Sequence, residues 1–126
     1  MIINMKKMKK QYILSLFLEH NENDYDMVHF AKEGFGITVF YTGSKVTQYK
    51  SMFDAEAKQI YINGLTTDND EARFLVSYHI AEYILKDDIK ISIIGINNMD
   101  ADVCRLAQQI YQKSENIKNK QLKKGK

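Results

Sequence analysis

The chain of 126 residues has no proline, no tryptophan and only one cysteine. Because Cys104 stands alone, it cannot form an intramolecular disulfide, and no pair of cysteines is available to ligate a metal ion. This cysteine content favours a reducing, cytoplasmic setting. The sequence also lacks the roughly 20 consecutive apolar residues that a membrane-spanning helix needs, so we expect no membrane partner.

A secretion signal is also not expected at the N-terminus, although the first residues are basic and then apolar. The apolar run from Tyr12 to Leu18 is short, and Ser15 interrupts it. Glu19 follows the run where a signal peptide would have small residues before its cleavage site. The segment is more typical of an amphipathic helix.

Charge is distributed unevenly along the chain. Residues 1–10 carry four lysines and no acid, and residues 113–126 carry six lysines and one acid. Between them, residues 11–112 hold eight basic and fifteen acidic side chains. Such an acidic body is a poor surface for nucleic acid, so direct nucleic-acid binding is not expected. We interpret the lysine-rich ends as solvated segments.

Apolar periodicity predicts two helices before residue 36. The first presents one stripe with spacings of three and four, formed by Met5, Met8, Tyr12, Ile13, Leu16 and Phe17. The second begins near Asp24, within a segment rich in capping residues, and ends at Gly34 and Gly36. Its inward residues are expected to be Met27, Val28, Phe30 and Ala31.

Three short β-branched and aromatic runs predict strands at 37–41, 48–53 and 58–62. The polar segment 54–57 is short enough for a hairpin loop between the second and third runs. We therefore expect a three-stranded, mainly antiparallel sheet. Residues 89–96 fit either a strand or a buried loop.

The clearest helix of the sequence begins at Asp68, which has capping-box spacing to Glu71. The segment EARFLVSYHIAEYILK that follows is apolar nearly all round, as in a buried central helix. A last helix begins near Asp100 and continues beyond Tyr111. The sequence thus predicts one α+β domain over residues 1–112, with its core at 24–111, followed by a disordered lysine-rich tail at 113–126.

Over residues 24–111 this order of elements resembles the ImmA/IrrE metallopeptidase family. That family has a strand containing Gly-Ile, an Ile-Tyr-Ile-Asn-like strand, an acidic stretch, and Arg-Phe three residues before a His-Glu-x-x-His zinc helix. The counterparts here are Gly36-Ile37, Gln59 to Asn63, Asp68 to Glu71, and Arg73-Phe74. The resemblance implies a small zincin-like domain with N-terminal helices, a buried central helix and a C-terminal helix.

The zinc motif itself is not present in this chain. Tyr78 stands at the place of the first zinc-binding histidine, His79 at the place of the general-base glutamate, and Glu82 at the place of the second histidine. The family chemistry needs two imidazoles four residues apart, both directed at one Zn²⁺, and a carboxylate beside them. A phenol and one carboxylate do not supply that set.

The third zinc ligand of the family is a glutamate on the following helix, three residues before an Ala-Asn or Ala-Asp pair. Ala101-Asp102 resembles that pair, which places Asn98 at the ligand position and leaves Asp100 as the nearest carboxylate. The family's usual Met-Pro end of this helix is also missing. Because all three ligands and the base are replaced, hydrolysis by the family mechanism is not expected.

Two interpretations of this vestigial site remain. In the first, Tyr78 fills the volume of the lost metal and its hydroxyl bonds Glu82, with His79 as another partner for that carboxylate. In the second, His79, Glu82 and Asp100 bind Zn²⁺ or another divalent metal, since His79 and Glu82 are three residues apart on one helix. We favour the first, so no metal or other cofactor is expected.

Three functions follow as hypotheses. The resemblance implies a cytoplasmic regulatory protein of a phage, mobile element or stress locus that binds a protein partner, with a helix-turn-helix repressor as the implied candidate. The alternative is a metal-dependent peptidase with an atypical site at His79, Glu82 and Asp100. A second alternative is a structural or oligomeric phage component that associates through its N-terminal helix.

Overall fold

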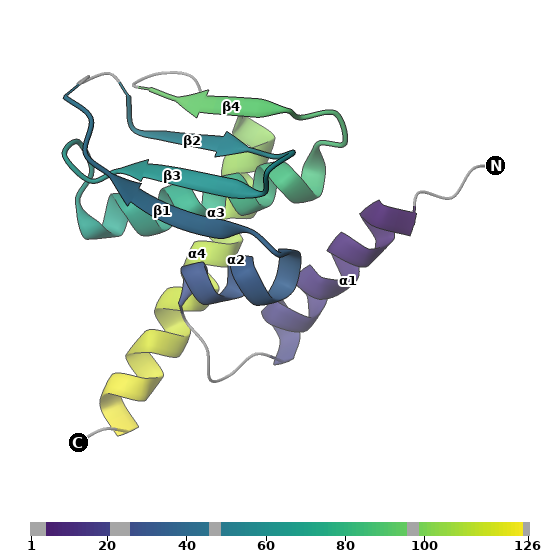
Figure 1. Ribbon diagram of the computed structural model, residues 1–126. Helices are drawn as coiled ribbons and strands as arrows, with labels where there is room; N and C mark the ends of the chain where they lie inside the picture. Colours follow the sequence, from purple (N-terminus) through teal and green to yellow (C-terminus); the bar gives the residue numbers. More distant parts are fainter. Residues whose placement is uncertain (1–4, 21–25, 46–48, 96–98, 125–126) are drawn as a thin grey trace.

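The computed structural model of the protein describes residues 5–20, 26–45, 49–95 and 99–124. Over these residues it has four helices and one four-stranded mixed sheet (Figure 1). The α+β class predicted from the sequence is therefore confirmed. The elements are α1 (Met5–His20), α2 (Met27–Phe35), β1 (Thr38–Thr42), β2 (Ser51–Asp54), β3 (Gln59–Asn63), α3 (Asn69–Leu85), β4 (Ile91–Ile94) and α4 (Ala101–Lys124).

The sheet has four strands where three were predicted, and it is mainly antiparallel, as expected. Its order is β1-β3-β2-β4, and β1 pairs with β3 in parallel, whereas the other two pairings are antiparallel. The segment 89–96, for which strand and loop were both open, contains β4. Local sequence indicates that a run is extended, but the neighbour and direction of a strand depend on contacts that are distant in the sequence.

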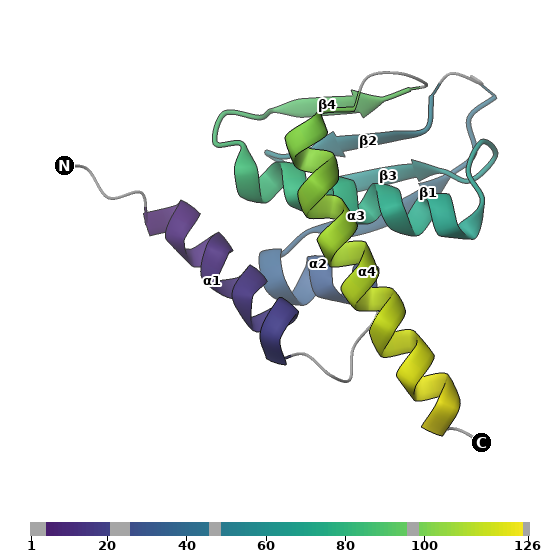
Figure 2. The same cartoon turned by 180° about the vertical axis from the view of Figure 1, so that it is seen from behind.

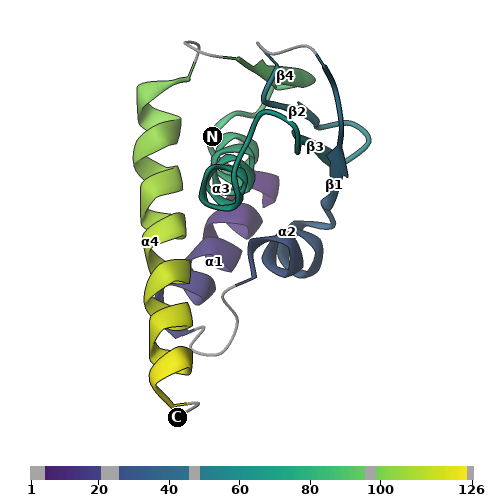
Figure 3. The same ribbon diagram turned by 90° about the vertical axis from the view of Figure 1, so that its left-hand side faces the viewer.

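Helix α3 lies between the sheet and α4, with α4 as the outermost layer (Figure 3). This position explains why the helix is apolar nearly all round, because one side packs on the strands and the other on α4. The buried central helix predicted from the sequence is thus confirmed. From the sheet side the core is completed by Phe53, Ile60, Ile62 and Ile94.

The predicted capping residues position α3 and the end of α2. The carboxylate of Asp68 accepts a hydrogen bond of 2.8 Å from the backbone N–H of Glu71. Gly36 ends α2 with a left-handed backbone, φ 71°, which glycine adopts without a steric penalty. The start of α2 differs slightly from the prediction, because its N-cap is Asp26.

The apolar stripe predicted for the first helix is partly wrong. Leu14 and Phe17 are buried, whereas Met8, Tyr12 and Leu16 are 57%, 64% and 42% exposed. The Phe17 ring stacks on that of Phe30 in α2, with 4.2 Å between centroids. The docking of α1 on α2 therefore decides which of two overlapping apolar stripes faces inward.

Helix α4 continues well past residue 112, where the sequence predicted the end of the domain (Figure 2). Within the segment expected as a disordered tail, Ser114 and Ile117 are buried. The guanidinium of Arg73 on α3 donates to Ser114 Oγ over 2.9 Å and also forms an ion pair with Glu115. These contacts extend the packing of α4, although the lysines themselves indicated a solvated segment.

The outer face of the sheet is covered by no helix within the described parts of the chain (Figure 3). Strand register places Phe40, Tyr61, Met52 and Ile93 side by side across all four strands, and we name these residues the outer apolar row. Phe40 and Ile93 are 40% and 54% exposed. Among the described residues, no helix is long and apolar enough to cross a membrane.

Candidate functional site

His79 lies on the side of α3 that faces the sheet, and its ring is fully buried. Its Nε2 atom is 2.6 Å from the hydroxyl oxygen of Ser51 on β2. Ser51 points inward because it alternates along the strand with Met52 and shares the inner face with buried Phe53. Helix and strand thus bring together two polar side chains 28 positions apart.

Glu82 lies one turn further along α3 and extends this hydrogen-bonded chain. Its Oε1 atom is 2.6 Å from His79 Nδ1, and its Oε2 atom accepts a hydrogen bond of 2.6 Å from the hydroxyl of Ser92 on β4. We name these four residues the Ser51–His79–Glu82–Ser92 array. It connects the central helix to two neighbouring strands, β2 and β4, which pair antiparallel.

The array is buried and its hydrogen-bonding capacity is used internally. Ser51 and His79 are 0% exposed and Glu82 is 3% exposed. Over the described residues, every buried side-chain nitrogen or oxygen has a hydrogen-bond partner. Serine, histidine and carboxylate follow each other in the order of an acyl-transfer triad. However, a substrate carbonyl cannot reach a hydroxyl that is buried completely, so this arrangement supports the fold.

Tyr78, at the place of the family's first zinc ligand, points away from the array toward the start of α4. Its hydroxyl accepts a hydrogen bond of 2.8 Å from the backbone N–H of Asp100. The expected bond from Tyr78 to Glu82 is not formed, because the Tyr78 hydroxyl lies at the start of α4, where it meets the backbone of Asp100. Burial raises the pKa of the Tyr78 hydroxyl, so the phenol stays protonated at neutral pH.

Asp100 is engaged at the N-terminus of α4. Its Oδ1 atom accepts hydrogen bonds from the backbone N–H groups of Asp102 and Val103, and its Oδ2 atom lies 3.3 Å from Lys86 Nζ. The backbone bond from Val103 and the Lys86 ammonium lower the pKa of the Asp100 carboxyl. This carboxylate is therefore a helix cap and ion-pair partner.

The structure thus brings His79 and Glu82 together, whereas the Tyr78 hydroxyl meets the backbone of Asp100 and the alternative metal set with the Asp100 carboxylate is not assembled. Within the described residues, no three histidine, cysteine or acidic side chains are grouped closely enough to hold a metal ion. Asn98, the fourth residue of the vestigial site, lies outside the described residues. A metal at His79 and Glu82 would first have to displace the hydrogen bond between them.

Cys104, on the first turn of α4, is no better suited to nucleophilic chemistry than the buried Ser51 hydroxyl. Burial raises the pKa of its thiol, and the nearby Asp100 carboxylate raises it further. The thiolate is the reactive form of cysteine, so a raised pKa leaves the side chain largely unreactive at neutral pH.

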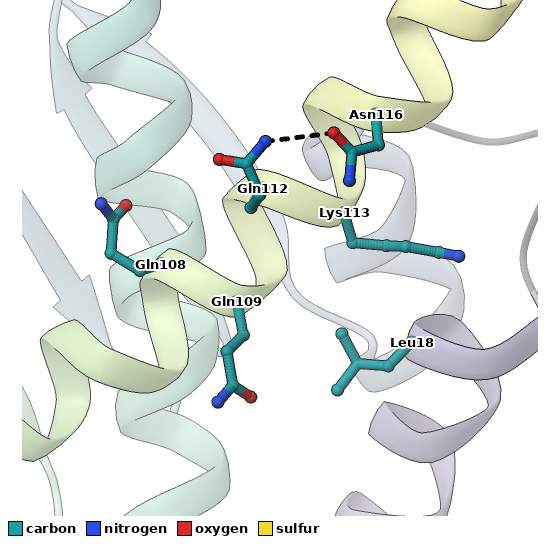
Figure 4. A pocket seen from close by; sticks show the side chains of 6 residues that line it. All are labelled: Leu18, Gln108, Gln109, Gln112, Lys113 and Asn116. Atoms are coloured by element: carbon teal, nitrogen blue, oxygen red, sulfur yellow. Dashed lines mark hydrogen bonds between the residues drawn. The ribbon is translucent and has the colours of Figure 1, made fainter.

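Two hollows lie near these elements. A cavity of about 530 Å³ borders the Glu82–Ser92 end of the array, and Lys86, Asp87 and Ile89 form part of its wall. Another of about 530 Å³ lies between Leu18 on α1 and the amide-rich face of α4 (Figure 4). In this second hollow, Gln112 donates to Asn116 over 3.1 Å, so part of its polar lining is paired internally.

Ser51 and Ser92 were not identified from the sequence. Each is a small polar residue on the inner face of a strand whose other inward neighbour, Phe53 or Ile94, is a buried apolar residue. That interruption of an apolar face is the signal that could have identified them. It becomes meaningful only with the strand register, which places both serines beside α3.

Comparisons with protein-family models, with curated proteins and with solved structures find no match to this chain.

Proposed function

We propose that this protein is a catalytically silent relative of the ImmA/IrrE metallopeptidases with a zincin-like domain. In this proposal it is a cytoplasmic regulatory protein of a phage, mobile element or stress locus. It acts by binding a protein partner, and a helix-turn-helix repressor is the first candidate to test.

The closed Ser51–His79–Glu82–Ser92 array carries the proposal. At the helix positions where the resembled family has its base and its second zinc ligand, this chain places His79 and Glu82, which bond each other and the two serines. A hydrolytic metal site needs an open coordination position for water. A buried and internally satisfied array provides no such position, so a role in binding is favoured over catalysis.

The outer apolar row supports a role in binding. Phe40 and Tyr61 stack with 5.3 Å between centroids, and Met52 and Ile93 continue the row to the other edge of the sheet. Contiguous exposed apolar groups of this kind are typical of protein-interaction surfaces. The acidic body of the chain would complement a basic DNA-binding partner and raise the association rate.

Elemental analysis of protein purified without a histidine tag or chelator tests the catalytic half of the proposal. We expect no stoichiometric zinc, manganese or iron, even after incubation with excess zinc, and no cleavage of casein. Near-stoichiometric metal that is lost in His79→Ala would instead favour the peptidase alternative at His79, Glu82 and Asp100.

Calorimetric titration with a helix-turn-helix repressor from the host tests the binding half. We expect saturable one-to-one binding without cleavage of the repressor, as judged by its mass after incubation. Absence of binding, both by titration and by co-purification from the host, would contradict the proposal whatever the metal content.

One observation favours the oligomeric alternative, namely the exposed apolar face of α1. Met8, Tyr12 and Leu16 lie at intervals of four residues on this face and remain exposed in the monomer. An oligomer formed through α1 would sediment with a concentration-dependent mass, and Tyr12→Lys would reduce that mass to the monomer's. A monomer at every concentration would exclude this alternative.

A further inference from the structure

A pocket of about 410 Å³ lies where α1 meets the end of α2, the β2–β3 turn and the last turns of α3. It is separate from the vestigial site, and its volume is in the range of small-molecule sites in proteins. Its charged lining consists of Lys9, Lys10 and Lys58, with no acidic side chain. Two of these lysines come from the lysine-rich N-terminal segment, and the fold places them beside Lys58 of the acidic body.

Lys10 is held in place at the wall of this pocket. Its Nζ donates a hydrogen bond of 2.9 Å to the backbone carbonyl of Tyr83 and lies 3.8 Å from the centroid of the Tyr83 ring. The charge is therefore positioned before any ligand arrives, which reduces the entropy lost on binding.

Lys58 approaches the pocket from the β2–β3 turn with an uncommon backbone. Its φ is +54°, a left-handed backbone conformation that residues other than glycine rarely adopt. Its ammonium lies close to Gly36, since a Cβ added at Gly36 would lie 3.8 Å from Lys58 Nζ. For Lys9 and Lys58, the described part of the chain offers no ion pair, so both charges are available to an anion.

The other walls of the pocket are apolar. Ile13, Phe35 and Tyr83 supply this apolar surface. The carbonyls of Ala31 and Lys32 at the end of α2 already accept hydrogen bonds from Ile37 and Gly36. The acids Glu56 and Asp87 line an adjoining hollow, which shares Lys10, Lys58 and Tyr83 with this pocket.

We propose that this pocket binds a small phosphate ester with a flat apolar body, of the nucleoside monophosphate class. Three ammonium groups match the double negative charge of a phosphate monoester better than a single carboxylate. The apolar walls of Ile13, Phe35 and Tyr83 match a flat ring. This site is independent of the function proposed above, because neither the array nor the outer apolar row contributes to it.

Isothermal titration with AMP, phenyl phosphate, adenosine and inorganic phosphate tests the proposal on the full chain. AMP and phenyl phosphate should bind with a dissociation constant below about 1 mM, whereas adenosine and inorganic phosphate should each bind at least tenfold more weakly. Raising the salt concentration should weaken AMP binding, because the lysines are largely exposed.

Lys9→Gln and Lys58→Gln should each weaken AMP binding about fivefold, the factor expected when one ammonium–anion contact is lost near water. The matched control is Lys120→Gln, which removes the same charge from an exposed position on α4. All three variants should keep the circular dichroism spectrum of the parent.

Any of three results would overturn the proposed site. The first is no detectable AMP binding up to about 10 mM. The second is an equal effect of all three lysine substitutions, and the third is equal affinity for AMP and inorganic phosphate; each of these two would show nonspecific attraction to surface charge.

Discussion

At the scale of single residues, His79 connects α3 to β2 through its two ring nitrogens. One nitrogen faces Ser51 on β2 and the other faces Glu82 on its own helix. A neutral imidazole has one donor and one acceptor, so it can satisfy a hydroxyl and a carboxylate at the same time. His79 therefore allows both buried neighbours to be paired.

Replacing His79 by leucine should lower the free energy of unfolding by about 3 kcal/mol, because Ser51 and Glu82 would each lose a buried partner. Glu82→Gln should lower it by only about 1 kcal/mol, since the amide can still accept from His79 and bond Ser92. Urea unfolding followed by circular dichroism measures both. If His79→Leu lowers the free energy of unfolding by no more than about 1 kcal/mol, the hydrogen bonds of the array contribute little to stability.

At the scale of elements, the stability of α3 and α4 depends on side chains at their ends and along their shared face. Asp68 caps α3, Asp100 caps α4, and the Tyr78 hydroxyl joins the middle of α3 to the first residues of α4. Arg73 on α3 makes a second connection to α4, through Ser114 and Glu115.

The capping carboxylate of Asp100 should make stability depend on pH. Hydrogen bonds from Val103 and Lys86 lower its pKa in the folded protein below the ordinary 3.8. Its contribution is therefore present above the unfolded-state pKa and is lost as the pH falls through the folded-state value. Asp100→Asn keeps an oxygen for the backbone but removes the charge. Its deficit in unfolding free energy should be constant from pH 7 to 5 and shrink below pH 4.

Urea titrations at a series of pH values measure this deficit, with Asp102→Asn as the control. Asp102 is exposed on the same first turn, and its carboxylate contacts Arg105 without capping the helix. If both variants have the same pH profile, the cap itself does not carry the effect.

Truncation after residue 112 tests whether the end of α4 belongs to the domain. Loss of buried Ile117 and of the partners of Arg73 should lower the free energy of unfolding by about 2–3 kcal/mol. Truncation after residue 120, which keeps these contacts, is the matched control. Unchanged stability in the shorter protein would support the solvated tail that the lysine content indicated.

At the scale of the whole molecule, the helices and the sheet form layers that leave one sheet face open (Figure 3). The inner face of the sheet meets α3, and the outer apolar row has no cover within the described residues. Phe40 and Ile93 in that row remain 40% and 54% exposed, which leaves apolar surface for an intermolecular contact.

The double variant Phe40→Ser and Ile93→Ser should weaken binding of the repressor at least tenfold, because central apolar residues commonly dominate a protein interface. Its free energy of unfolding should fall by only about 2 kcal/mol, since both side chains are about half exposed in the monomer, so the variant should remain folded. Leu122→Ser, at a 61% exposed position on α4, is the control. Full affinity in the double variant would place the partner elsewhere.

The sequence by itself determined the class and the local boundaries of this protein. The capping box at Asp68, the left-handed glycine at Gly36 and the apolar α3 were all predictable, because backbone geometry and nearby side chains control them. The absence of a His-Glu-x-x-His motif was equally visible, since it depends only on residue identity and spacing. These features are local in the chain, so no partner distant in sequence is needed to infer them.

The tertiary structure alone decided which residues meet. The parallel pairing of β1 with β3, the inward face of α1 and the packing of α4 beyond residue 112 all depend on contacts between distant segments. The same holds for the site, where Ser51 and Ser92 reach His79 and Glu82 only through the register of β2 and β4. The sequence alone does not show which face of the sheet a strand serine occupies or which side chain it meets, because both depend on the strand register of the assembled sheet.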